Sequence, residues 1–342
     1  MKFGGLIIWP VSHLLGIKNL DPNNLPKTQY KVQAYPDAFT LLQSLMPLIP
    51  VCIMCWLTNL AYPIEQEMAE ARISMDKYNA GDDDLSNFNW ILKITARDLI
   101  VSLTTPLLWQ ILFYNSSYAS TLRAVKFNKD YPAEKHIWRE VPYSICTVVM
   151  GAFIEAFLMM MYATGRLNNY FMDIREHPFA FFALLLTLPI WRNGHFYCIH
   201  RFEHQWNTTW FPDIGKWMYE NVHYLHHQSR NFQPWSGIAM HPVEGFMYET
   251  ACMIPCLFFH HPIMINLTKI EENLGAILGH DGFDFPGNGD WYHLIHHMKI
   301  NCNYGNTMAP YDYVFGTLDQ GDGSELAEQN EKYEKEMNKR EK

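Results

Sequence analysis

Histidines are concentrated in the second half of this chain. Of its 16 histidines, 13 lie between His195 and His297. Eight of them form three groups with short spacings: His200 and His204; His223, His226 and His227; His293, His296 and His297. Residues three and four apart share a helix face, so each group would present its imidazoles in one direction. Imidazole binds iron, zinc, copper and nickel, and eight imidazoles exceed what one such ion can use. The spacing therefore predicts a site for two metal ions.

Four apolar segments precede the histidine groups. Residues 39–62 and 99–118 carry no charge, residues 141–162 carry only Glu155, and residues 178–191 lead towards the first histidine group. A helix of about 20 residues crosses a hydrocarbon layer about 30 Å thick. We expect an all-α integral membrane protein with about four transmembrane helices, in which Glu155 is a protonated or hydrogen-bonded carboxyl facing another helix. The mean hydropathy of −0.16 hides these segments because polar loops separate them.

The division of the chain follows from these segments. We expect an N-terminal interfacial segment (residues 1–38), a transmembrane region (39–191), a histidine-rich catalytic domain (192–318) and a charged C-terminal tail (319–342). Five basic residues lie between positions 123 and 139, in the loop between the second and third apolar segments. Basic loops favour the cytoplasmic side of a membrane. With four transmembrane helices, the segment after the fourth lies on the same side as this loop. We therefore expect the histidine-rich helical cap in the cytoplasm.

Several function classes are disfavoured by composition and motifs. The formal net charge is −9 and no basic stripe is present, which argues against a nucleic-acid partner. The seven cysteines are dispersed and predict no disulfide framework. The His-Glu-x-x-His signature of zinc peptidases is absent. Soluble di-iron bundles use two Glu-x-x-His pairs, whereas this chain has one, from Glu220 to His223.

The ordered histidine groups resemble those of the fatty acid hydroxylase and sterol desaturase superfamily, a set of membrane-bound di-iron oxygenases. Four further segments carry the resemblance: HPVE at residues 241–244, GHDGF at 279–283, NYG at 303–305 and FGT at 315–317. The resemblance covers roughly the second half of the chain. HPVE, NYG and FGT are most similar to the sterol desaturase branch.

The resemblance implies the chemistry and the cofactors. It implies two iron ions, with zinc as an alternative occupant in purified protein, and O2 as co-substrate. No His-Pro-Gly-Gly haem-binding segment is present, so electrons from NAD(P)H are expected through an external carrier such as cytochrome b5. The expected reaction is hydroxylation or desaturation of a membrane lipid, with a sterol favoured over a fatty acyl chain. Both reactions remain open because each begins with removal of one hydrogen from the lipid. The expected location is the endoplasmic reticulum, with a mitochondrial membrane as the alternative.

The predicted site consists of metal ligands and of residues near them. The predicted ligands are the eight grouped histidines, together with His280, which the resemblance adds: His200, His204, His223, His226, His227, His280, His293, His296 and His297. Residues that could bind metal or hydrogen-bond to a ligand are His195, His241, Glu244, Asp281, Asp284 and Asn303. No catalytic residue beyond the metal ligands is predicted. His260 and His261 match no motif, and we expect them to be structural.

Two other functions stay open. The chain could be a non-catalytic membrane scaffold or complex subunit that retains the fold and the metal site. It could also be a metal-dependent hydrolase in the bilayer, which would need a zinc ion with an open water position and no oxygen.

Overall fold

The computed structural model describes residues 48–117, 119–283, 290–306 and 311–319, together with 321, 326–328 and 331. Helices are the regular elements of this part of the chain, and two isolated β-bridges join Lys126 to Phe283 and Tyr170 to His260. The prediction of an all-α fold is therefore confirmed for the described residues. The expected interfacial segment at residues 1–38 and most of the charged tail lie outside them.

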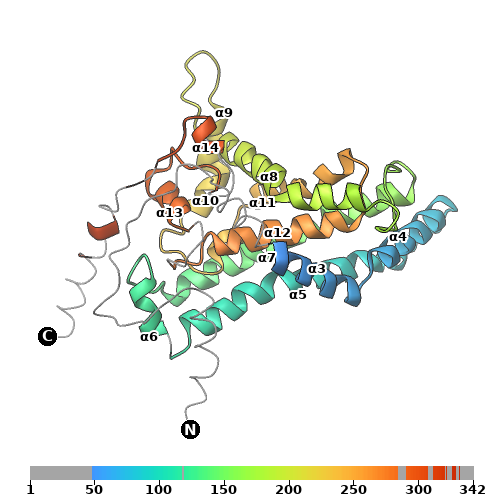
Figure 1. Cartoon of the computed structure of the whole chain (residues 1–342), viewed down its shortest axis with the longest axis horizontal. Coiled ribbons are helices and arrows are strands. Elements are labelled where there is room, and N and C mark those ends of the chain that lie inside the picture. The colour runs from blue at the N-terminus through green and yellow to red at the C-terminus, as the bar shows by residue number, and fades with distance from the viewer. Residues whose placement is uncertain are drawn as a thin grey trace, which may run out of the picture.

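Six long helices run roughly along the long axis of the molecule, and several of the shorter helices gather towards the left end in Figure 1. The long helices are α3 (Leu48–Ala61), α4 (Ile64–Asn79), α5 (Asn89–Trp109), α7 (Glu134–Ala163), α8 (Pro178–Phe202) and α12 (Ile263–Leu278). The shorter helices are α6 (Ala119–Leu122), α9 (Ile214–Met218), α10 (Tyr224–His227), α11 (Pro242–Glu249), α13 (Asp290–Lys299) and α14 (Tyr311–Val314). Helical turns of 3-10 type cover Leu85–Phe88, Arg123–Val125, Ser236–Ile238 and Thr250–Leu257, and π turns cover Gln110–Tyr114 and Tyr219–His223.

The apolar segments match these helices to different degrees. Residues 141–162 lie within α7, and residues 178–191 form the first part of α8, which continues without a break to Phe202. Residues 99–118 begin in α5 and pass into a π turn after Trp109. Of residues 39–62, the described part is α3 with the residue that follows it.

Among the described helices, α7 is long and apolar enough to cross a membrane. A second crossing would need α3 and α4, bent by 48° at their break, to act as one span. The expectation of about four transmembrane helices therefore stays a prediction.

Two apolar clusters hold the long helices together. In one of them, Trp90 and Ile94 of α5 pack with Leu158 and Met159 of α7. The other joins α3, α8 and α12 and includes Leu188 of α8. Burying a side chain of this size stabilises a fold by about 1.5–3 kcal/mol. Helix α12 contributes to both clusters, so it lies at the centre of the packing.

A buried network of charged side chains also connects four helices. Arg97 of α5 donates to Glu67 of α4, to Asp98 at 2.8 Å and to Glu155 of α7 at 2.6 Å. Lys269 of α12 donates to Asp98 and, at 2.6 Å, to Glu155. Each of these residues is buried. The expectation of a hydrogen-bonded Glu155 facing another helix is therefore confirmed, and its partners are cations.

Removal of one cation from this network should destabilise the protein. The variant Lys269→Met removes one of the cations that pair with the buried carboxylates. Breaking a buried ion pair lowers the free energy of unfolding by about 3–5 kcal/mol. The matched control is Lys93→Met, because Lys93 pairs with Glu70 at the surface, where such a pair contributes about 0–1 kcal/mol. The free energy of unfolding is measured by denaturant titration for the wild type and for both purified variants. Equal losses in the two variants would show that the network does not hold the helices together.

Candidate metal centre

The three histidine groups come together from separate elements at one end of the long helices. His200 lies in the last turn of α8, and His204 lies just past the end of that helix. His223 ends a π turn that runs directly into α10, which carries His226 and His227. The third group lies on α13, and His280 follows the end of α12. All nine predicted ligands are buried, each at most 6% exposed.

The nine histidines divide into two clusters. In each cluster, one ring nitrogen per residue lies within 4.8 Å of the corresponding nitrogens of the others. The first histidine cluster comprises His200, His204, His223, His227 and His296. The second histidine cluster comprises His226, His280, His293 and His297. The fold therefore brings the histidines together in two places, as the spacing predicts. Metal binding at these two places stays a prediction.

Helical geometry explains why adjacent histidines belong to different clusters. A helix turns by about 100° per residue, so residues four apart lie about 40° from each other, whereas neighbours point in clearly different directions. His223 and His227 accordingly share the first cluster, and His226 joins the second. On α13, His297 joins the second cluster and its neighbour His296 joins the first. The two groups therefore interleave, and each contributes to both clusters.

Backbone carbonyl groups fix the tautomer of three cluster histidines. The Nδ1–H of His200 donates to the carbonyl oxygen of Tyr304 at 2.7 Å, and that of His296 donates to Cys302 at 2.6 Å. In the second cluster, the Nδ1–H of His280 donates to the carbonyl oxygen of Ala276 at 2.8 Å. A carbonyl oxygen only accepts hydrogen bonds. In the neutral ring, Nε2 therefore carries the lone pair.

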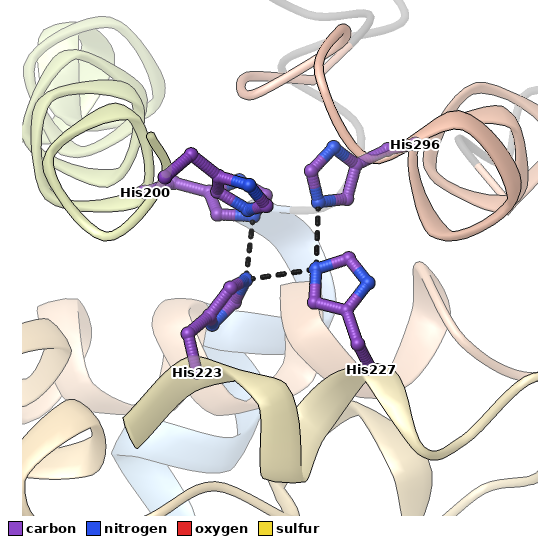
Figure 2. Close-up of side chains that lie close together, drawn as sticks. His200, His223, His227 and His296 are labelled. Carbon is purple, nitrogen blue, oxygen red and sulfur yellow. Dashed lines mark hydrogen bonds between the residues drawn. The ribbon is translucent and has the colours of Figure 1, made fainter. Parts of the chain in front are cut away.

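The Nε2 atoms of the first cluster converge, as Figure 2 shows for four of its members. The Nε2 atoms of His200 and His223 are 3.2 Å apart, those of His223 and His227 are 3.0 Å apart, and those of His227 and His296 are 3.1 Å apart. Both ring nitrogens of His204 are buried and have no hydrogen-bond partner among the described residues. The Nε2 lone pairs of His200 and His296 point into this group of ring nitrogens, and a cation among them would engage these nitrogens together, so this donor set fits a metal ion.

In the second cluster, the Nε2 atoms also lie close to one another. The Nε2 atom of His226 lies 3.1 Å from that of His280 and 3.2 Å from that of His297. The Nε2 atom of His293 is buried and makes no hydrogen bond within the described part of the chain. Four imidazoles thus surround one point, which also fits a metal ion.

Burial keeps the cluster imidazoles neutral. It lowers the pKa of His226 to about 4, and it lowers the pKa values of His227 and His297 well below the ordinary 6.5. Neighbouring histidines lower the pKa values of His227 and His297 further, because two imidazolium ions at this distance would repel each other. At pH 7 the rings are therefore in the unprotonated form that binds metals.

Two carboxyl groups lie behind the first cluster. A carboxyl oxygen of Glu244 on α11 lies 2.7 Å from Nδ1 of His223 and makes a hydrogen bond with it, so this contact orients the ring with Nε2 towards the cluster. The Glu203 carboxyl lies 3.7 Å from the same Nδ1 and is fully buried. Burial raises the pKa of Glu203 to about 8. Glu203 is absent from the predicted set, although its place directly before His204 is a signal in the sequence.

The other candidate residues near the ligands have different contacts. His195 and His241 belong to neither cluster: Nε2 of His195 lies 3.0 Å from Oγ1 of Thr250, and Nδ1 of His241 accepts from the backbone N–H of Val243 at the start of α11. Asp281 accepts from Trp109 at 3.3 Å. Asp284 lies outside the described residues.

Asn303 supports the site indirectly. Its side-chain amide donates to the carbonyl oxygens of Tyr292 at 3.1 Å and Asp319 at 2.8 Å, and its φ is 53°. It therefore holds the turn that presents the carbonyl groups of Cys302 and Tyr304 to the histidines. His260, which was expected to be structural, contacts the hydroxyl of Tyr162 and belongs to neither cluster.

Comparison with known proteins places this site in a family. Residues 183–317 match the fatty acid hydroxylase family model. The chain is 29% identical over 156 residues to a Delta(7)-sterol 5(6)-desaturase of Gibberella zeae, covering 42% of this chain and 45% of that protein. It is 24% identical over 198 residues to human lathosterol oxidase (54% and 62%) and 25% identical over 260 residues to a Delta(7)-sterol 5(6)-desaturase of Candida dubliniensis (73% and 64%).

The chain thus spans between 45% and 64% of the length of these relatives. No solved structure matches it. All nine cluster histidines lie within the matched residues 183–317. The part of the chain that holds both clusters therefore matches the fatty acid hydroxylase family, and sterol C5(6)-desaturases are among the proteins to which the chain is similar.

Proposed function

We propose that this protein is a membrane-bound oxygenase that hydroxylates or desaturates a lipid with two irons held in its two histidine clusters. The observation that carries this proposal is the burial of nine imidazoles, in two adjacent clusters, with Nε2 atoms facing one another at 3.0–3.2 Å. A sterol is favoured over a fatty acyl chain because curated relatives are sterol desaturases and a lathosterol oxidase.

Bound iron and O2 would supply the oxidising power for removal of hydrogen from an unactivated carbon, which no side chain provides. The protein's own part is to hold and shield this centre. Glu244 and the backbone carbonyl groups hold the imidazoles with Nε2 inwards. Phe232 packs on His280 and His297 at ring distances of 4.7 and 4.8 Å, and buried Tyr304 packs on His204 at 5.0 Å. These rings restrict the access of water to the clusters. Electrons would come from NAD(P)H through a separate carrier such as cytochrome b5.

The outer faces of the long helices support a membrane location. Large apolar side chains stay exposed there, among them Trp56 of α3, Ile100 of α5, Phe153 of α7 and Leu186 of α8. Exposed apolar surface of this extent on adjacent helices is suited to lipid rather than to water. We therefore assign α3, α5, α7 and α8 to the bilayer, with the histidine cap in the cytoplasm. The endoplasmic reticulum is the proposed membrane, and a mitochondrial membrane is the alternative.

Turnover with labelled oxygen tests the function. The purified protein, loaded anaerobically with Fe(II) and supplied with NAD(P)H, a reductase and cytochrome b5, should consume O2 when a Δ7-sterol is added. Loss of two hydrogens, with the label released in water, would identify desaturation, whereas one labelled oxygen in the product would identify hydroxylation. A fatty acyl lipid serves as the competing substrate. A non-catalytic scaffold would bind metal without lipid-dependent O2 consumption, and that result would contradict the proposal. A hydrolase would act without O2.

Adjacent histidines should control different metal ions. His296→Ala removes one imidazole from the first cluster, and His297→Ala removes one from the second. Each variant should therefore fall from about two bound ions per chain towards one, as measured by mass spectrometry of the metal content. His241→Ala is the matched control, because His241 lies outside both clusters, and it should keep about two ions. Equal loss in His241→Ala, or no loss in the other variants, would refute the two-centre assignment.

The lowered pKa of His226 predicts a pH dependence of stability. Between its unfolded pKa of 6.5 and its folded pKa of about 4, the unfolded chain binds a proton that the folded chain does not. The contribution of His226 to the free energy of unfolding is therefore fully present above pH 6.5 and is lost as the pH falls towards 4. In metal-free protein, the stability of the wild type relative to His226→Gln should decrease by up to about 1.4 kcal/mol per pH unit in this window. Comparison of the two proteins cancels other titrating groups. A difference that is independent of pH would refute the assignment.

A further inference from the structure

Exposed apolar side chains wind along the surface of helix α8. Phe182, Leu186 and Ile190 are each about half exposed and lie four residues apart. The same spacing passes through Gly194 to Cys198, which is exposed, and to Phe202, which is 36% exposed. Each step of four residues turns about 40° around the helix axis, so these side chains form a stripe that winds around α8. The stripe runs from Phe182 near the start of α8 to Phe202 at its end, next to the histidine clusters.

The stripe continues into the segment that follows α8. We call residues 205–217 the aromatic loop; Figure 1 shows the chain after α8 projecting from the molecule beside α9. The ring of Phe202 packs on Trp206 at 5.5 Å, Trp206 on Phe211 at 6.2 Å, and Phe211 on Trp210 at 5.1 Å. Trp210 is 85% exposed and Trp217 is 58% exposed. An unbroken series of aromatic contacts therefore connects the stripe of α8 to the tip of the loop.

Hydrogen bonds hold the aromatic loop in place. The carboxylate of Asp213 accepts from the backbone N–H groups of Trp206 at 2.9 Å, Asn207 at 2.8 Å and Lys216 at 2.9 Å. Gly215 packs so closely on the chain that a Cβ there would lie 2.1 Å from the carbonyl oxygen of His204. The loop is thus fixed to the backbone of a first-cluster histidine, and it presents its aromatic side chains in a preformed arrangement.

The composition of the loop suits the surface of a lipid bilayer. Within residues 205–217 the charged side chains are Asp213, whose carboxylate closes the loop, and Lys216. Tryptophan prefers the region between hydrocarbon and water, because its ring is apolar and its N–H is polar. A lysine near such rings is compatible with lipid headgroups. Exposed tryptophans joined to a lipid-facing stripe therefore match the interfacial layer of the membrane in which α8 is proposed to lie.

We propose that the aromatic loop inserts into the interfacial layer of the bilayer and holds the histidine clusters against the membrane surface. This inference rests on the proposed function only through the placement of α8 in the bilayer. Because the loop is fixed to His204, its insertion sets the depth of the first cluster relative to the lipid. A lipid substrate would then reach the clusters from the bilayer rather than from water.

Spin labels on the full chain in phosphatidylcholine nanodiscs test this placement. The background is Cys198→Ser, which removes the exposed thiol, and its residual labelling is subtracted. One label is introduced through Trp210→Cys, a second through Leu186→Cys on the stripe, and a third through Asp83→Cys in an exposed polar turn. Collision with O2, which concentrates in lipid, is compared with collision with a water-soluble nickel chelate. We expect the ratio of O2 to nickel collisions to be several-fold higher at positions 210 and 186 than at position 83.

The outcomes separate this inference from the proposed function. A ratio at position 210 equal to that at position 83, with lipid contact at position 186, would overturn the loop insertion and leave the membrane assignment intact. A loop that binds a protein partner instead would give this same result, because the nanodisc holds only this chain. Water contact at position 186 would overturn the membrane assignment and the inference together. Only variants with wild-type metal content are compared, and Trp217→Cys provides a second loop position if Trp210→Cys does not fold.

Discussion

The burial of many ring nitrogens next to one another is the constraint on which the site depends. Neutral imidazoles with Nδ1 bound to an oxygen, such as His200 and His296, have only an acceptor left at Nε2. Two such acceptors cannot hydrogen-bond to each other, and their burial keeps water from them. A cation between the rings would engage these lone pairs, so metal binding would be coupled to the folding of this region. The elements that meet here, α8, α10, α13 and the end of α12, would then share their stability through the two ions.

The interleaved arrangement of the histidines fixes the distance between the two clusters. His226 and His227 are neighbours in the chain and yet belong to different clusters, and the same holds for His296 and His297. The peptide unit within each of these two neighbouring pairs therefore limits how far apart the clusters can lie. A movement of α10 or α13 displaces ligands of both clusters at once. The fold is therefore suited to a pair of metal ions that act together.

Much of the candidate site could be predicted because the sequence signal is local. The short spacings within the histidine groups bring eight imidazoles close together on helical elements, whereas His280 was predicted from the family resemblance. The expectation that each group presents its imidazoles in one direction was wrong, because both α10 and α13 contribute histidines to both clusters. The carbonyl groups of Tyr304, Cys302 and Ala276 could not be predicted, because a backbone contact leaves no residue signature. The cation partners of Glu155 were equally hidden, since Arg97 and Lys269 are distant in the chain and only the packing of the helices brings them together.

The buried charge network and the histidine clusters are connected through α12. Lys269 fixes this helix against α5 and α7, and two turns later the carbonyl oxygen of Ala276 accepts from His280. Arg192 of α8 adds a second link, donating to Glu271 of α12 at 2.6 Å. Because α8 carries His200 and α12 leads into His280, this ion pair holds together the helices that supply ligands to different clusters. Ionic contacts in the apolar part of the molecule thus help to set the geometry of the site, which gives these charged residues a structural role where hydrocarbon side chains would be expected.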